Sequence, residues 1–67
     1  MYAVQTTNEF TDDNARAIAA SIMRGIDKSN RRIIITDSET GSIVFHYENK
    51  GIQLADIDFV VQALSEN

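Results

Sequence analysis

The first half of the chain carries one apolar stripe at helical spacing. It comprises Ala15, Ile18, Ala19, Ile22 and Ile26. Residues three or four apart lie on one face of a helix, so the stripe predicts an amphipathic helix over residues 12–28. Thr11 suits the N-cap, and Phe10 has the staple spacing to Ala15. Ser29-Asn30 is expected to end the helix, because Asn tolerates a left-handed stop.

Three segments rich in β-branched and aromatic residues predict strands. They are residues 2–7, 31–36 and 43–48. The polar segment 37–42 separates the last two and contains Gly41, so these two strands are expected to form a hairpin. Ile33 and Ile35 share one face of the first hairpin strand, while Ile34 lies on the other. One helical layer covers only one sheet face, so we expect the second face to meet something as well.

A second helix is predicted over residues 53–64, after a break at Asn49-Lys50-Gly51. Its expected core stripe is Leu54, Ile57, Val61 and Leu64. Phe59, Val60 and Ala63 widen the apolar surface beyond one stripe, which indicates either the core of a helix buried on two sides or an oligomer or partner interface. The expected order is strand–helix–strand–strand–helix. The sequence thus predicts an α+β fold, a small antiparallel sheet with helices packed on one face, as a single domain over residues 1–67.

Composition limits the means of stabilising so short a chain. With 67 residues the protein has room for one domain, and a domain of this size is only marginally stable alone. It has no Cys and one His, so disulfides are excluded and a transition-metal site is not expected. Oligomerisation is the remaining support, and we expect a homodimer.

Charge is distributed unevenly. The net charge is −4, which disfavours nucleic acid and anionic membranes as partners. One basic segment, residues 24–32, holds Arg24, Lys28, Arg31 and Arg32 against Asp27. Cations favour a helix C-terminus, and phosphate or acidic-protein contact is the alternative interpretation. No apolar run is long enough to span a membrane and the start lacks a basic leader, so a cytoplasmic location is expected.

Candidate catalytic groups lack the partners that chemistry requires. His46 is the only side chain that titrates near neutrality, and no nucleophile and orienting group accompany it at a suggestive spacing. Asp37 and Glu39 flank a turn without meeting the calcium-loop pattern. The loop 39–42 has a single Gly and no following helix, unlike a phosphate-binding loop. We therefore expect neither an enzyme nor a cofactor or metal site.

Several motifs resemble those of the Phd/YefM type of antitoxin. Asn14-Ala15-Arg16 opens the first helix, and residues 22–27 are similar to the end of the family's helix. Ile33-Ile34-Ile35-Thr36 and Ile43-Val44-Phe45 resemble the family's hairpin. The resemblance implies a dimer whose N-terminal region contacts operator DNA, with Arg16 as a phosphate or base contact. Asp37 stands where the family usually has a basic residue.

A shorter segment is similar to the smallest phage inhibitors of uracil-DNA glycosylase. The residues are Lys50-Gly51-Ile52-Gln53-Leu54-Ala55-Asp56, between hairpin and second helix. Those inhibitors are acidic dimers that imitate DNA. Where they place a partner-inserting Phe after the Asp, this chain has Ile57, with Phe59 two residues on.

These observations lead to two hypotheses. The first is a small acidic interaction protein that regulates or inhibits a partner protein as a homodimer. By analogy with small stand-alone proteins that work in this way, we expect it to be encoded by a phage or mobile element. Apolar anchors ringed by charge are typical of binding hot spots, so the expected contact residues are Phe59, Asp56, Asp58 and Val60. The alternative is an antitoxin-like dimeric repressor. It would bind DNA through Arg16, Arg24, Arg31 and Arg32.

Overall fold

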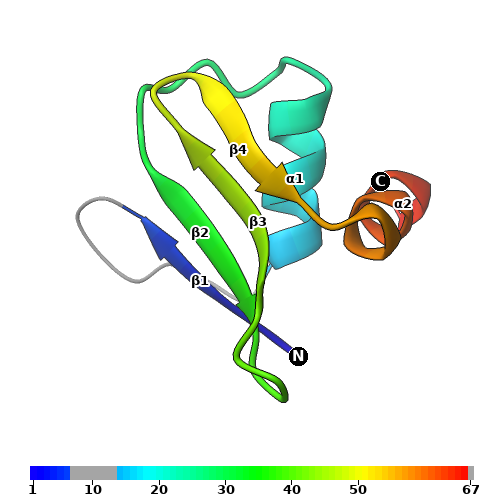
Figure 1. Cartoon of the computed structure of the whole chain (residues 1–67). Helices are drawn as coiled ribbons and strands as arrows, with labels where there is room; N and C mark the ends of the chain where they lie inside the picture. The colour runs from blue at the N-terminus through cyan, green and yellow to red at the C-terminus, as the bar shows by residue number, and fades with distance from the viewer. Residues whose placement is uncertain (7–13, 67) are drawn as a thin grey trace.

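A computed structural model describes residues 1–6 and 14–66, which form one sheet and two helices. The strands are β1 (Tyr2–Thr6), β2 (Ile33–Asp37), β3 (Ile43–Glu48) and β4 (Gly51–Ala55); the helices are α1 (Ala15–Met23) and α2 (Ile57–Glu66). The sheet is antiparallel throughout, in the order β1-β2-β3-β4. Both helices lie on one side of it (Figure 1). The predicted α+β class with helices on one face is confirmed.

Strand β4 is the element that the sequence did not predict. Asn49 and Lys50 have φ values of 56° and 64°. A two-residue hairpin with a type I′ turn requires this left-handed conformation at both positions. The turn sends Gly51–Ala55 back along β3 as an edge strand. The predicted break at residues 49–51 is therefore right. The second helix begins at Ile57 and not at Gln53.

Helix α1 is shorter than the predicted 12–28, because Gly25 ends it. Gly25 has φ +73° and donates its N–H to the Ile22 carbonyl at 3.0 Å, while the Ile26 N–H reaches the Ser21 carbonyl at 2.9 Å. These two bonds form a Schellman stop, which favours Gly at the left-handed position. Ile26 consequently leaves the apolar stripe and is exposed. Thr11 and Phe10, the predicted cap and staple, lie outside the described residues.

The core lies between the sheet and the two helices. Val4, Ile33, Ile35, Phe45 and Phe59 are the largest fully buried side chains. The predicted stripe on α1 supplies buried alanines and Ile22, with Ile18 packed against the core. Small side chains at Ala15, Ala19, Ala20 and Ala63 are buried and let the helices approach the sheet and one another closely.

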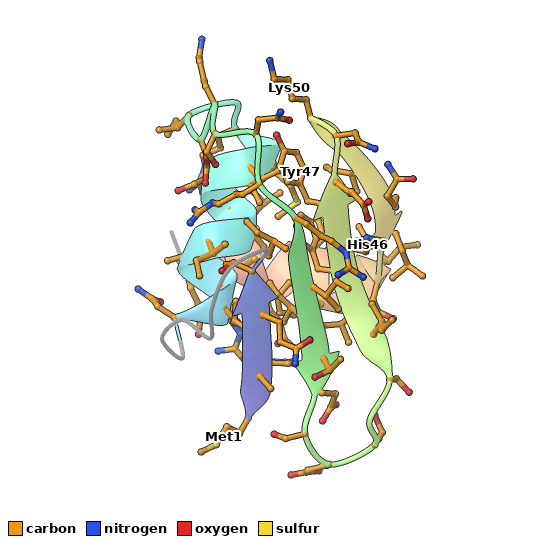
Figure 2. All side chains as sticks on the ribbon, turned by 90° about the vertical axis from the view of Figure 1, so that its left-hand side faces the viewer. Met1, His46, Tyr47 and Lys50 are labelled. Atoms are coloured by element: carbon orange, nitrogen blue, oxygen red, sulfur yellow. The ribbon has the colours of Figure 1, made fainter. Side chains whose placement is uncertain are left out.

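Neither of the two described helices lies over the opposite face of the sheet, which is named here the open face. Cross-strand pairing places Gln5, Ile34, His46 and Leu54 in one row across all four strands. A second row joins Ala3, Thr36 and Ile43. Figure 2 looks onto this side of the sheet, with His46 labelled on β3. The helices thus cover one face of the sheet, as expected. That the second face meets something as well stays a prediction.

Candidate functional site

The predicted contact residue Phe59 belongs to the core. Its side chain is 2 % exposed, and its ring meets the Tyr2 ring edge-on with centroids 5.0 Å apart. The Phe45 ring lies on another side at 6.3 Å. A side chain enclosed by two aromatic rings of its own chain is not available to a partner. The expectation that Phe59 anchors a partner is therefore wrong: the sequence shows its apolar character, but the fold decides which way it faces.

The two predicted acidic contacts belong to the start of α2. Asp56 is the N-cap: its Oδ1 accepts the Phe59 N–H at 3.1 Å, and its carbonyl accepts the Val60 N–H at 2.9 Å. Asp58 lies in the first turn and is exposed, where a negative charge suits the helix dipole. Val60 is half-buried. Of the four predicted contact residues, Asp58 is the one whose side chain remains open to a partner without disturbing a cap or the core.

Helix α2 turns its predicted core stripe toward solvent. Ile57, Val61 and Leu64 are 78 %, 59 % and 41 % exposed. At 100° per residue these three lie on the side of the helix opposite Phe59 and Ala63, which are buried. The prediction that Ile57, Val61 and Leu64 form the core side of the helix is wrong. Both sides of α2 are apolar, so the sequence pattern alone could not select the buried one.

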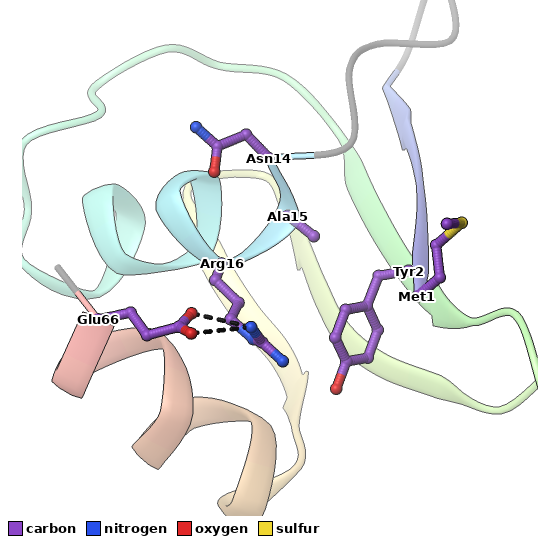
Figure 3. Close-up of a pocket in the computed structure, with 6 residues that line it drawn as sticks. All are labelled: Met1, Tyr2, Asn14, Ala15, Arg16 and Glu66. Atoms are coloured by element: carbon purple, nitrogen blue, oxygen red, sulfur yellow. Dashed lines mark hydrogen bonds and ion pairs between the residues drawn. The ribbon is translucent and has the colours of Figure 1, made fainter.

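Arg16, the predicted nucleic-acid contact, is engaged within the chain. Its Nη1 lies 2.9 Å from Glu66 Oε2 and 3.0 Å from Oε1, and its Nη2 donates to Gln62 at 3.1 Å. The guanidinium carbon stands 5.4 Å from the centre of the Tyr2 ring. Hydrogen bonding to Glu66, and then to Tyr2, raises the pKa of Arg16. This residue connects α1 to the end of α2 (Figure 3).

The other three predicted basic contacts also have partners inside the chain. Arg31 pairs with Asp27 at 2.6 Å. Hydrogen bonding from the Ser29 hydroxyl, followed by Arg31, lowers the pKa of Asp27 to about 2. Arg24 donates to the Leu64 carbonyl at 3.1 Å, at the end of α2. Side chains held in this way have to give up an internal contact before they can contact a phosphate.

Arg32 and the only histidine meet at Glu48. Arg32 Nε lies 3.3 Å from Glu48 Oε1, and His46 Nε2 lies 2.9 Å from the same oxygen. Hydrogen bonding by His46 lowers the pKa of Glu48, and the Arg32 charge acts in the same direction. The three side chains form a polar group on the open face, with His46 between Ile34 and Leu54 in the row that crosses the sheet. None of the three is the Ser, Thr or Cys nucleophile that a Ser–His or Cys–His pair requires.

A pocket of about 460 Å³ lies between the start of β1, the start of α1 and the end of α2. Tyr2, Arg16 and Glu66 line it together with Met1, Asn14 and Ala15 (Figure 3). The Arg16 to Glu66 ion pair stands within it, so the cation is already neutralised. Within residues 1–6 and 14–66, no cluster of three or more His, Asp and Glu side chains could hold a metal ion. None of the helices described is long and apolar enough to cross a bilayer.

The open face combines apolar side chains with polar ones. Ile43 and Leu54 are 45 % and 46 % exposed, and Ile34 lies half-buried between β1 and β3. His46 lies between Ile34 and Leu54 and is joined to Glu48, which also pairs with Arg32. An antiparallel sheet with one face in water normally carries polar residues there. The run Ile33-Ile34-Ile35 is the sequence signal for this surface; the contribution of Leu54 was missed because it was assigned to a helix.

No family model, curated protein or solved structure matches the chain. The resemblances to Phd/YefM antitoxins and to glycosylase inhibitors therefore stay predictions. Any statement about function depends on the surfaces described above.

Proposed function

We propose that this is a small non-enzymatic interaction protein that acts by binding a partner protein through its open face. The observation that carries the proposal is the placement of Ile34, Ile43 and Leu54 on the sheet face that neither α1 nor α2 covers. Apolar side chains interspersed with polar ones are the usual composition of a non-obligate protein–protein interface. The surface replaces the one around Phe59 that the sequence suggested.

The chemistry of the partner follows from charge and shape. A chain with a net charge of −4 attracts a basic protein and repels an acidic one during diffusional encounter. The open face is a sheet surface, so its complement is an exposed apolar patch surrounded by Lys or Arg. Regulation or inhibition of such a partner would require only that the bound sheet cover its working surface.

DNA binding ranks second. Arg16, Arg31 and Arg32 each form an ion pair with a carboxylate of the chain. Transfer of these cations to phosphates would leave the carboxylates unpaired near DNA, which is unfavourable for an acidic protein.

The decisive experiment is affinity capture followed by a binding measurement with purified partner. The parent protein and the double variant Ile43→Lys/Leu54→Lys would be used as baits in a lysate of the source organism. Ile26→Lys is the matched control, because Ile26 is also exposed but lies after α1 and away from the open face. We expect one basic protein in stoichiometric amount with the parent and the control, and loss of it with the double variant.

Titration calorimetry with that protein should show a weakening of roughly 100-fold or more in the double variant, the scale of losing two interface anchors. Equal capture by all three baits would refute the open face as the contact. Salt-sensitive retention of the parent on DNA, lost in Arg16→Ala and Arg32→Ala, would instead favour the repressor alternative.

A further inference from the structure

Helix α2 has a solvent-facing apolar stripe that the open face does not use. Ile57, Val61 and Leu64 follow one another at spacings of four and three residues, and all are exposed. They lie on the side of α2 turned away from its contacts with the sheet and α1, where Phe59 and Ala63 are buried. A helix that is apolar on both sides is normally buried on both. This stripe therefore lacks a covering layer within the described chain.

The charges beside the stripe differ in sign at its two ends. At the start of α2 stands Asp58, exposed and in the first turn. At the far end the exposed Arg24 extends from α1, and its Nη2 is fixed at 3.1 Å from the Leu64 carbonyl. The acidic end belongs to the helix itself, and the basic end is supplied by the neighbouring helix. Glu66 also lies at the far end of α2, but it is paired with Arg16, so Arg24 supplies the unbalanced charge there. The stripe is thus acidic at one end and basic at the other.

We propose that the stripe packs against the same stripe of a second copy, with the two α2 helices antiparallel about a two-fold axis near Val61. A two-fold interface must be self-complementary, since the same patch is used twice. Antiparallel pairing sets Ile57 of one copy opposite Leu64 of the other and Val61 opposite Val61. It also brings Asp58 of each copy close to Arg24 of the other, so the dimer contains two such pairs of opposite charges.

This charge arrangement favours a second copy over an unrelated partner. Asp58 and Leu64 are six residues apart, roughly 9 Å along a helix, so one α2 spans the acidic and basic ends of the other. A parallel pair would instead place acid beside acid and base beside base. The antiparallel pair also sets the helix dipoles in opposite directions. The dimer leaves the open face uncovered, so this inference is independent of the proposed function.

The stripe is short, so the dimer is expected to dissociate in the micromolar range. Sedimentation velocity would follow the mass between 7.5 kDa and twice that value as concentration is raised. Val61→Glu places two carboxylates together at the two-fold axis and should weaken association roughly 100-fold or more. Circular dichroism of this variant should stay unchanged, because residue 61 is largely exposed in the single chain.

A charge exchange tests the pairing itself. Arg24→Glu alone and Asp58→Arg alone should each weaken the dimer roughly tenfold or more, since each places like charges together twice. The double variant Arg24→Glu/Asp58→Arg should recover to within roughly threefold of the parent. Within one chain both changes oppose the α2 dipole, so recovery in the double variant can arise only between chains.

Two further variants control for net charge. Lys28→Glu makes the same charge change as Arg24→Glu, and Glu39→Arg makes the same change as Asp58→Arg; both sites are exposed and away from α2. Both should dimerise like the parent. The proposal is overturned by a parent that stays at 7.5 kDa at all concentrations, by a dimer that ignores Val61→Glu, or by a double variant that does not recover. Capture of a partner by monomeric Val61→Glu would still support the proposed function.

Discussion

Replacing Phe59 by Ala tests whether this residue belongs to the core or to a binding surface. The side chain is 2 % exposed and packs against the rings of Tyr2 and Phe45. Deleting a buried Phe side chain costs about 3–5 kcal/mol, because the transfer free energy is lost and a cavity remains. A 67-residue domain has a free energy of unfolding of only about 3–10 kcal/mol. Phe59→Ala should therefore lose between about a third and all of this free energy of unfolding.

Urea denaturation followed by far-ultraviolet circular dichroism would measure this loss. Ile26→Ala is the control, because it also removes a large apolar side chain but from an exposed position. We expect the control to change the free energy of unfolding by less than about 0.5 kcal/mol. A Phe59→Ala variant within about 1 kcal/mol of the parent would refute the core assignment and restore Phe59 as a surface anchor.

Three further changes probe the backbone and one carboxylate. Gly25→Ala should lower the free energy of unfolding, measured by thermal melts, by about 1 kcal/mol, because residue 25 has φ +73°. Gly51→Ala is the control, since its new Cβ would meet only ordinary contacts at 3.7 Å and beyond. Lys50→Gly should raise the melting temperature and stabilise the fold by about 0.5–1 kcal/mol, because Lys occupies φ 64° in a turn that favours Gly; a lower melting temperature would contradict the turn assignment. Hydrogen bonds from Ser29 and Arg31 hold the pKa of Asp27 at about 2, below its ordinary 3.8, so the ionised form stabilises the fold above pH 3.8 and this contribution is lost as the pH falls toward 2. Between pH 3.8 and 2 the free energy of unfolding of the parent should fall by about 1–2 kcal/mol more than that of Asp27→Asn, after allowance for solvent screening. The same dependence of the free energy of unfolding on pH in both proteins would show that Asp27 contributes nothing.

The sequence predicted elements whose pattern admits one reading. The stripe of Ala15, Ala19 and Ile22 matches the helical period, and β2 and β3 have β-branched runs around a polar turn. The predicted end of α1 at Ser29-Asn30 is wrong, because the helix already stops at Gly25. A Gly that follows a helical stripe is the stronger stop signal, since it adopts positive φ without strain.

Strand β4 was missed because its residues do not favour a strand strongly. Gln53, Leu54 and Ala55 are good helix formers, and their spacing continues into the stripe of α2. What makes them a strand is the tight turn at Asn49-Lys50, which returns the chain alongside β3. Hydrogen bonding to a neighbouring strand is a tertiary effect that local propensity does not contain.

The candidate site was predicted in part. The doubly apolar run Ile33-Ile34-Ile35 correctly indicated that a second sheet face is apolar. Which side of α2 is buried could not be inferred, because Phe59 and Val61 are both apolar and lie on opposite sides. The fold settles this by placing Tyr2 and Phe45 against Phe59. The ion pairs of Arg16 with Glu66 and of Arg32 with Glu48 join residues far apart in the sequence, so a local pattern could not predict them.

Strand β4 also affects whether the protein aggregates at high concentration. It is an edge strand whose five residues, Gly51–Ala55, carry no charge and no proline, the usual devices that stop edge strands from joining into open-ended assemblies. Its remaining protection is the irregular register opposite His46 and Tyr47, where Gln53 is the extra residue. A bulge of this kind bends and twists the strand, which makes it a poor template for another chain. Deleting Gln53 would straighten that edge, and the expected phenotype is fibre formation without loss of the hydrophobic core.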